Sequence, residues 1–319
     1  MSVKIEHYRS EYLSGVIECL QRNFKWMESK DEACLEDWLV PLTDYKWSNS
    51  KIDENDFPYK SGMVIMDDYK IVGYLGLIYS NRKISGTIKT VVNTSTWAID
   101  EGYGFYLIQA VKKICDSADI ITSFTPCIEV LRTLKSLFKF EVECCKKLRL
   151  MPIPYEGKCN VQIKFIDNGM QINDSDVRAE YLDHLRYGIK CISVKNKKNE
   201  FFILYKILCG KGRYIRIIKC SNKKMFANYA HEIIWEMQKK ECIDCTGDNK
   251  DILKELLIKS YNREWLATEC DYSIFGDDDI NYPLINEKAV NRLILNKNSD
   301  KNTIDDLLYS ELSIMNFDE

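Results

Sequence analysis

Residues 90–113 of this 319-residue chain read TVVNTSTWAIDEGYGFYLIQAVKK, and this stretch decides the predicted fold. Its β-branched start continues a run that predicts a strand over residues 87–99. The pattern then changes to the period of a helix, which we predict over residues 106–116. The apolar stripe of that helix consists of Leu107, Ala110, Val111 and Ile114.

The sequence on both sides of this stretch predicts a mixed sheet. Two further strand-like runs precede it, and the turns between the three runs are short, which favours an antiparallel meander. The predicted fold class is therefore α/β of the α+β type, with a mixed, mostly antiparallel sheet flanked by helices. The predicted elements around the stretch are a helix at 11–23, strands at 63–66, 71–79, 118–124 and 138–150, and a helix at 128–137.

The second half of the chain repeats part of this order. Two prolines and a glycine near residues 151–160 predict a linker, so we expect domains at 1–152 and 160–319. A second trio of strands feeds a helix there, which fits either a degenerate internal repeat or a common motif that arose independently. The elements expected are strands at 188–194, 200–208, 214–220 and 241–246, and helices at 225–239, 251–262 and 288–296.

Composition excludes several classes of protein. Lys and Arg number 45 against 48 Asp and Glu, and this balance argues against a nucleic-acid binder. No apolar run reaches the roughly 20 residues of a membrane helix, and the first residues lack the apolar core of a signal peptide. We therefore expect a cytoplasmic protein whose cysteines are reduced. Cys242 and Cys245 have zinc-site spacing without a second pair, so no metal is expected.

Residues 90–113 resemble the fourth strand, cofactor loop and following helix of the GCN5-related N-acetyltransferase (GNAT) superfamily. Residues 125–141 resemble the next helix of that family and the turn into a late strand. The chain is most similar to acyltransferases associated with bacterial surface-polysaccharide biosynthesis, whose strand ends in Trp and enters an Asp-x-x-Tyr loop. Here those residues are Trp97, Asp100 and Tyr103, with weaker echoes at 183–184 and in the Tyr-Ser-Glu-Leu run at 309–312.

The resemblance implies a binding site made of backbone. In such a fold a bulge separates two neighbouring strands, and the pantetheine arm of acetyl-CoA lies in the gap like an added strand. The diphosphate would lie on amides at the N-terminal end of the next helix. The backbone groups expected in the gap are those of Trp97, Ala98 and Ile99, and those expected in the loop belong to Gly102, Tyr103, Gly104, Phe105, Tyr106 and Leu107.

Side-chain candidates for chemistry are fewer. Thr94 and Ser95 stand where the bulge is expected, as candidate catalytic hydroxyls that could hold a water or the acceptor. The alternative is that both face the strand ladder. Phe24, Trp26 and Asp37 lie in the region that covers the acceptor in this family, and ordinary loop packing is the alternative for them.

The implied function is transfer of an acetyl group from acetyl-CoA to an amine, with an amino sugar of a surface-polysaccharide precursor as the acceptor. The expected partners are this small-molecule amine and, in a homodimer, a second copy of the chain. A different class of function stays open, because the loop lacks the family's starting Arg and carries Leu107 and Gln109 where small residues are usual. That alternative is a catalytically inactive binding or scaffolding module. A third alternative is an acyltransferase that uses a longer acyl chain.

Overall fold

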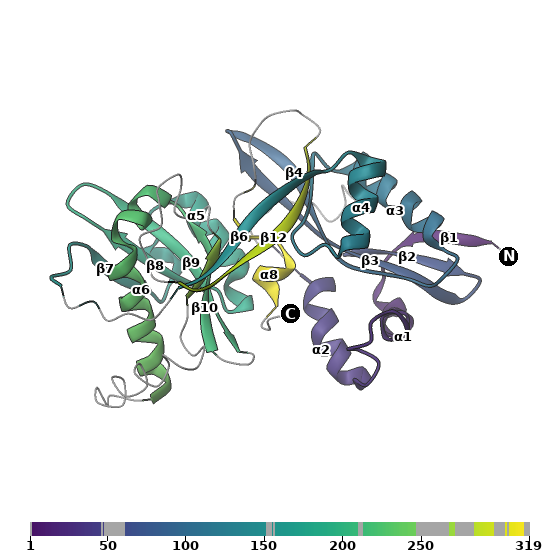
Figure 1. Cartoon of the computed structure of the whole chain (residues 1–319), viewed down its shortest axis with the longest axis horizontal. Coiled ribbons are helices and arrows are strands. Elements are labelled where there is room, and N and C mark those ends of the chain that lie inside the picture. The colour runs from purple at the N-terminus through teal and green to yellow at the C-terminus, as the bar shows by residue number, and fades with distance from the viewer. Residues whose placement is uncertain are drawn as a thin grey trace. The chain divides into compact units, whose positions relative to one another are not determined.

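The computed structural model describes residues 2–45, 47, 61–150, 155, 157–209, 213–246, 268–271, 284–296, 304 and 306–315. The chain forms two compact units, drawn in Figure 1. Unit 1 comprises residues 1–143, 291–303 and 309–315, and unit 2 comprises residues 144–290, 304–308 and 316–319. Neither unit is continuous in the sequence, since each takes segments from both halves of the chain.

Unit 1 is built on a mixed sheet with the strand order β1-β2-β3-β4-β5-β12. Its β4–β5 pair is parallel and its other described pairs are antiparallel, which confirms the predicted fold class. The elements are β1 (Val3–His7), α1 (Leu13–Asn23), α2 (Glu32–Thr43), β2 (Gly62–Asp67), β3 (Lys70–Ile84), β4 (Thr87–Ile99), α3 (Gly104–Ser117), β5 (Ile120–Ser123), α4 (Ile128–Phe138) and α8 (Glu311–Ile314), with parts of β6 (Glu141–Leu150) and β12 (Leu284–Asn296).

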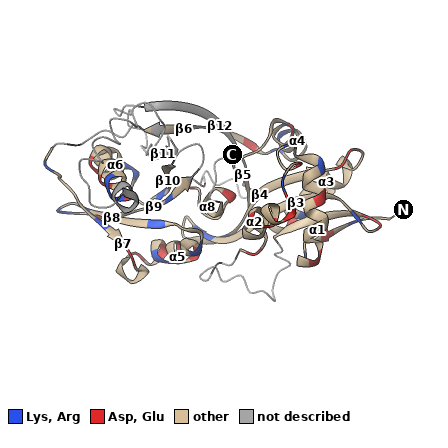
Figure 2. Cartoon of the chain, turned by 90° about the horizontal axis from the view of Figure 1, so that it is seen from below, with Lys and Arg blue, Asp and Glu red and all other residues tan. Residues whose placement is uncertain are grey.

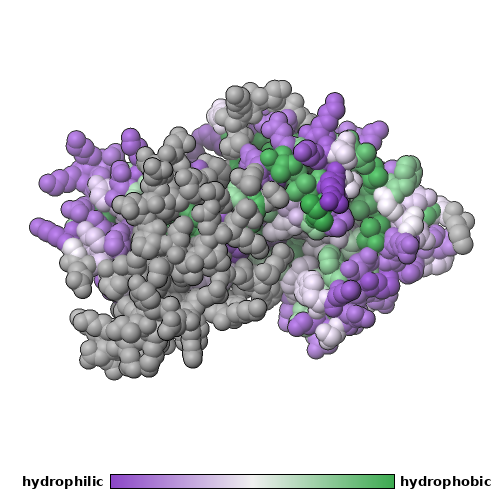
Figure 3. Space-filling model, viewed as in Figure 1, coloured by the Kyte–Doolittle hydropathy of each residue, from purple (hydrophilic) through white to green (hydrophobic). Residues whose placement is uncertain are grey.

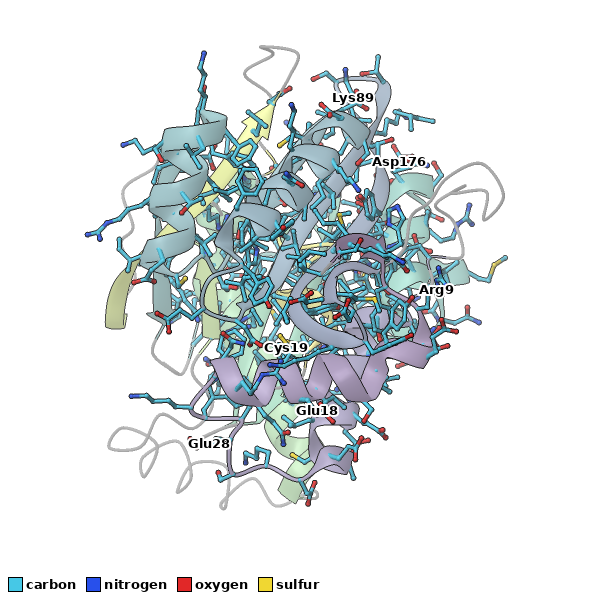
Figure 4. The ribbon with its side chains drawn as sticks, turned by 90° about the vertical axis from the view of Figure 1, so that its right-hand side faces the viewer. Arg9, Glu18, Cys19, Glu28, Lys89 and Asp176 are labelled. Carbon is cyan, nitrogen blue, oxygen red and sulfur yellow. The ribbon has the colours of Figure 1, made fainter. Side chains whose placement is uncertain are left out.

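Helices cover both faces of this sheet. One core joins α1 and α2 to the face that carries Ala98, and Figure 4 shows α1 with Cys19 turned toward the strands and Glu18 turned away. A second core joins α3 and α4 to the face that carries Trp97. Each helix thus buries its apolar stripe, and adjacent residues of β4 belong to different cores because side chains alternate along a strand.

Unit 2 repeats this order of elements. Three antiparallel strands, β8 to β10, lead into α6, and β11 then pairs in parallel with β10. Read from its first strand, the strand order is β7-β8-β9-β10-β11-β6, which matches the order in unit 1 position by position and supports internal duplication. The elements are β7 (Gln162–Ile166), α5 (Ser175–His184), β8 (Lys190–Lys195), β9 (Glu200–Cys209), β10 (Arg213–Cys220), α6 (Lys223–Thr246) and β11 (Thr268–Asp271).

Two sequence-based predictions for the second half are wrong. Residues 288–296, expected as a helix, belong to strand β12, where Leu293 lies opposite Ser123 of β5. Residues 241–246, expected as a strand, are the last turns of α6. Residues 288–296 are a strand because their partner β5 lies far away in the sequence, which local pattern does not show. Residues 241–246 simply continue α6 past its expected end at residue 239, since helix boundaries are the least predictable part of an element. The helix expected at 251–262 lies outside the described residues.

The described surface carries charges of both signs. Figure 2 shows Lys and Arg interspersed with Asp and Glu on the helices of both units. Apolar residues gather on unit 1 where α3 and α4 lie, as Figure 3 shows, and Ile128 and Leu137 of α4 are exposed. Within the described residues, every helix is too short or too polar to cross a membrane.

Candidate functional site

Strand β4 contains a bulge at the place that the family resemblance implies. Trp97 lies opposite Leu75 and Thr94 lies opposite Leu77, so the two residues between them on β4 face the single residue Gly76 on β3. The extra residue in β4 bends the strand and reverses which way its later residues point. Gly76 is required at this position, because a Cβ there would collide with the hydroxyl oxygen of Ser95.

The bulge lies where β4 loses its parallel neighbour. Val91, Val92 and Asn93 pair with β5, which ends at Ser123. Strand β4 continues to Ile99, so its last residues have β3 on one side and a gap on the other. Among the described residues, no strand pairs with β4 along this gap. The sheet of unit 1 is therefore open at the place where an added strand would fit.

The direction of the backbone groups follows from one hydrogen bond. The amide of Asp100 donates to the carbonyl of Val72 on β3 at 2.7 Å. Because backbone groups alternate between the two edges of an antiparallel strand, the groups of Ala98 also point to β3. Those of Trp97 and Ile99 point to the gap. Of the three residues that the resemblance implies, these two present their backbone to a ligand in the gap.

Two buried polar atoms at the bulge have no hydrogen-bond partner among the described residues: Ser95 Oγ and Trp97 Nε1. A buried donor without a partner is costly, and such a group commonly meets a water or a ligand. Thr94 differs, since its hydroxyl donates to the carbonyl of Thr122 at 3.2 Å and fastens β4 to β5. Of the two predicted catalytic hydroxyls, that of Ser95 is therefore the one without a hydrogen-bond partner among the described residues.

The loop after β4 is open at both of its glycines. Gly102 has a φ of 88°, a left-handed conformation that favours glycine, and a Cβ at Gly102 or Gly104 would meet no atom within 4 Å. Helix α3 begins at Gly104, and no side chain of the described residues caps its N-terminus. The amide of Tyr106 donates to the carbonyl of Tyr103, which leaves the amides of Gly104 and Phe105, at the positive end of the helix dipole, without a hydrogen bond among the described residues. Leu107, expected to crowd the loop, packs partly buried against the core, and Gln109 is exposed.

The Asp-x-x-Tyr motif holds this loop in place. Asp100 accepts hydrogen bonds from Arg22 and Asn23 at the end of α1 and pairs with Lys70 at 3.3 Å. Burial raises the pKa of Asp100, but these donors outweigh it and hold the pKa below the ordinary value. Tyr103 donates its hydroxyl to Asp67 Oδ2 at 2.6 Å. The two motif side chains therefore fix the loop and leave its backbone for a ligand.

Two of the three predicted acceptor residues, Phe24 and Trp26, lie at the turn between α1 and α2, and the third, Asp37, lies within α2. Phe24 and Trp26 form an aromatic cluster with Trp38, and Trp26 is 52% exposed. Phe24 directly follows Asn23, which is bonded to Asp100, so this cluster adjoins the cofactor loop. Asp37 lies on the exposed side of α2 and has no described contact with that cluster.

A polar cluster that sequence analysis missed lies at the point where β4 and β5 separate. The carboxylate of Glu311, from the N-terminal turn of α8, accepts hydrogen bonds from Asn93 Nδ2 on β4 and from Thr125 Oγ1 just past β5. Thr122 Oγ1 donates to Asn93 Oδ1 at 3.0 Å. About 200 residues separate Glu311 from its partners, and the only local signal was the Tyr-Ser-Glu-Leu echo at 309–312.

The described residues contain no group of three or more His, Cys, Asp or Glu side chains that could hold a metal ion. The site thus consists of four parts: an open strand edge, a bulge with two unpartnered donors, an uncapped helix end and a buried carboxylate. The first three parts suit an extended, anionic ligand with amide groups, such as the pantetheine diphosphate of coenzyme A, and the carboxylate suits a cationic group.

Comparison with known proteins supports the fold. A GCN5-related N-acetyltransferase from Kribbella flavida matches with a TM-score of 0.54 and 8% identity over 92% of this chain and 70% of that one. One from Anabaena variabilis matches with a TM-score of 0.51 and 11% identity over 92% and 73%. No protein-family model and no curated protein matches this chain. Identities this low establish the fold alone, and the chain has the fold of the GCN5-related N-acetyltransferases.

Proposed function

We propose that unit 1 transfers an acetyl group from acetyl-CoA to a primary amine. The observation that carries this proposal is the open edge of β4 beyond Asn93, which lies directly before an uncapped helix N-terminus. Bound acetyl-CoA would supply a thioester, which a neutral amine can attack. The alternative of an inactive binding module predicts the same fold and is separated from this proposal by the experiments below.

Each part of the site has a defined task in this proposal. The backbone groups of Trp97 and Ile99 pair with the pantetheine amides in the manner of a neighbouring strand. The amides at Gly104 and Phe105 receive the diphosphate, and the helix dipole stabilises its charge. The Ser95 hydroxyl is buried and has no hydrogen-bond partner among the described residues, so in this proposal it donates to the thioester oxygen at the bulge.

The acceptor we propose is an amine carried by a small molecule. An amino sugar is the acceptor class that the sequence resemblance implies, and the aromatic cluster of Phe24, Trp26 and Trp38 offers apolar faces of the kind on which sugar rings pack. The cytoplasmic location and the homodimer remain predictions from the sequence.

A charge placed at Gly104 tests the diphosphate site. Gly104→Asp puts a carboxylate at the first position of α3, where a Cβ meets no atom within 4 Å. The positive end of the helix dipole stabilises this charge, so we expect the variant to fold. The same carboxylate repels the diphosphate, so we expect acetyl-CoA affinity to fall about tenfold or more. The uncharged Gly104→Asn is the matched control and should bind like the parent protein.

Thermal unfolding with increasing acetyl-CoA measures this effect, because a specific ligand raises the melting temperature with the logarithm of its concentration. Calorimetric titration should give one site per chain. An unshifted melting temperature of the parent protein at about 1 mM acetyl-CoA would favour the inactive module. Equal binding by Gly104→Asp would place the ligand elsewhere.

A further inference from the structure

We infer that Glu311 is the base that takes a proton from the acceptor ammonium, an inference that rests on the proposed function. Glu311 is 3% exposed, and both of its carboxylate oxygens accept a described hydrogen bond. A carboxylate is seldom buried in this way unless it is paired, and its retention in a core marks a specific task.

The neighbours of Glu311 hold it at the reacting end of the gap. Asn93 is the last residue of β4 that pairs with β5, and Ser95 at the bulge follows two residues later. At a strand rise of about 3.3 Å per residue, the Asn93 backbone is roughly 7 Å from the bulge. The donor side chain of Thr125 follows the end of β5 on the other side of the gap. The carboxylate thus lies where the two strands part.

The face of the sheet also agrees with this role. Val92 belongs to the core beneath α3, so the next residue, Asn93, points to the opposite face, which α1 and α2 cover. Helix α8, which carries Glu311, packs against α2 on that side. Since the predicted acceptor residues Phe24 and Trp26 lie at the turn between α1 and α2, the carboxylate and these two residues are on one face of the sheet.

The local backbone fixes Glu311 before any substrate arrives. Tyr309 has a φ of 55°, a left-handed conformation that is strained for a tyrosine. Its ring is held edge-on by Trp47, with centroids 4.9 Å apart, and by the guanidinium of Arg82. Ser310 then caps the turn through a reciprocal pair of hydrogen bonds with Ser313. Several contacts thus hold a strained residue directly before the buried carboxylate, which restricts the position of Glu311.

A second fixed group orients the carboxylate. Thr122 donates to Asn93 Oδ1, so the amide nitrogen of Asn93 is the group turned toward Glu311. Thr125 is exposed, and its hydroxyl bond to Glu311 therefore connects the buried carboxylate to the surface. An ammonium that enters from this side meets an acceptor oxygen that the protein has already positioned.

The proton balance of the reaction is complete with this assignment. Glu311 takes one proton from the ammonium and later releases it to solvent. The neutral amine forms the C–N bond with the acetyl carbon while the C–S bond breaks. A second amine proton accompanies the departing thiolate, so that coenzyme A leaves as the thiol.

The test compares two acceptors in the full chain. Glucosamine is largely protonated at neutral pH and needs a base, whereas hydroxylamine is largely unprotonated and needs none. We expect Glu311→Gln to lower kcat with glucosamine about 100-fold or more and to leave transfer to hydroxylamine within about threefold of the parent. Acetyl-CoA should raise the melting temperature of the variant as it does that of the parent, which shows that the cofactor site is intact.

Glu232→Gln is the matched control, because Glu232 is a similarly buried carboxylate, bonded to Asn160 and Tyr155 in unit 2. It should leave both reactions unchanged. Equal losses with the two acceptors in Glu311→Gln, or no loss with either, would overturn the assignment of the base. A parent protein that transfers to hydroxylamine and to no alkyl amine would overturn it as well. A parent protein that neither binds acetyl-CoA nor acetylates hydroxylamine would instead contradict the proposed function.

Discussion

Unit 1 and unit 2 have the same order of strands and helices, but they differ in which backbone groups have hydrogen-bond partners among the described residues. In unit 1 the last parallel pair involves Asn93, and the bulge begins at Ser95. In unit 2 the last described parallel pair involves Arg216, and an extra residue, Ile218, follows at the same spacing. Each strand then leads into a helix. In both units, therefore, an extra residue in the strand lies just past the end of its parallel pairing.

In unit 2 the chain itself pairs with the strand at this extra residue. The amide of Leu307 donates to the carbonyl of Ile218 at 3.0 Å. A ligand amide bound at this strand edge would make the same kind of hydrogen bond. Asn222 caps α6 by accepting a hydrogen bond from the amide of Met225, whereas no described side chain caps α3. A strand edge and a helix end bind ligands only where the protein leaves them unpaired. The comparison therefore supports unit 1, rather than unit 2, as the ligand-binding half that we propose.

The two units also differ in charge where the strands separate. Asn93 in unit 1 contacts the carboxylate of Glu311. In unit 2 the equivalent Arg216 lies directly opposite Lys206 of β9, and both cations are buried. The two units thus place different side chains at this point, a hydrogen-bonded carboxylate in unit 1 and two basic residues in unit 2.

The largest expected effect comes from opening unit 2. Leu307 is 5% exposed, so Leu307→Ala should lower the free energy of unfolding by about 3 kcal/mol through the lost packing. Leu307→Pro also removes the amide that pairs with Ile218 and should cost about 1 kcal/mol more. Urea unfolding measures the totals, and faster hydrogen exchange in β10 and α6 should localise them. Equal stability of the two variants would mean that Leu307 does not close the gap by pairing.

An intermediate effect is expected from pH. Burial, followed by the charge of Arg216, lowers the pKa of Lys206 to about 7. In the unfolded chain this lysine keeps its ordinary value of 10.5, so between these values the unfolded state binds more protons and stability rises with pH. Between pH 7 and 9 the parent should gain about 2 kcal/mol relative to Lys206→Met. A constant difference across that range would contradict the lowered pKa.

Two buried thiols should make the protein less stable above about pH 9. Burial raises the pKa of the Cys19 and Cys191 thiols to about 12. Above their ordinary value near 9, the unfolded chain loses these protons first, so stability falls as pH rises further. Both the parent and Lys206→Met should show this fall in stability, because both proteins contain the two thiols.

The smallest expected effect concerns the loop of unit 1. Tyr103→Phe removes the hydrogen bond to Asp67 and leaves the ring in place. Because this bond orders the loop without contacting the ligand, acetyl-CoA should bind about threefold more weakly, which corresponds to under 1 kcal/mol. Calorimetric titration measures the change. Tyr69→Phe, at a side chain that is 99% exposed, should have no effect.

The local parts of the site could be predicted from the sequence. The strand expected at 87–99 is β4, the helix expected at 128–137 is α4, and the bulge lies beside Thr94. The strand and the helix follow from residue types a few positions apart, because β-branched runs and apolar stripes act locally, whereas the bulge was implied by the family resemblance.

The parts that depend on distant partners could not. The position of Glu311 is set by Asn93 and Thr125, and the pairing of Leu293 with β5 turned an expected helix into a strand. Periodicity contains no information about which segment lies beside another across 200 residues. The direction of the Ala98 backbone likewise depends on register with β3, which the sequence does not state.

The late strand β12 has a consequence for biosynthesis. Residues 293–296 pair with β5, yet the ribosome makes them about 150 residues after α4. At about 5–20 residues per second, the nascent sheet of unit 1 waits roughly ten to thirty seconds for its next strand. During that time the outer edge of β5 is a template for pairing with other chains. Chaperones that shield exposed strand edges should therefore engage this protein most strongly before residue 293 leaves the ribosome.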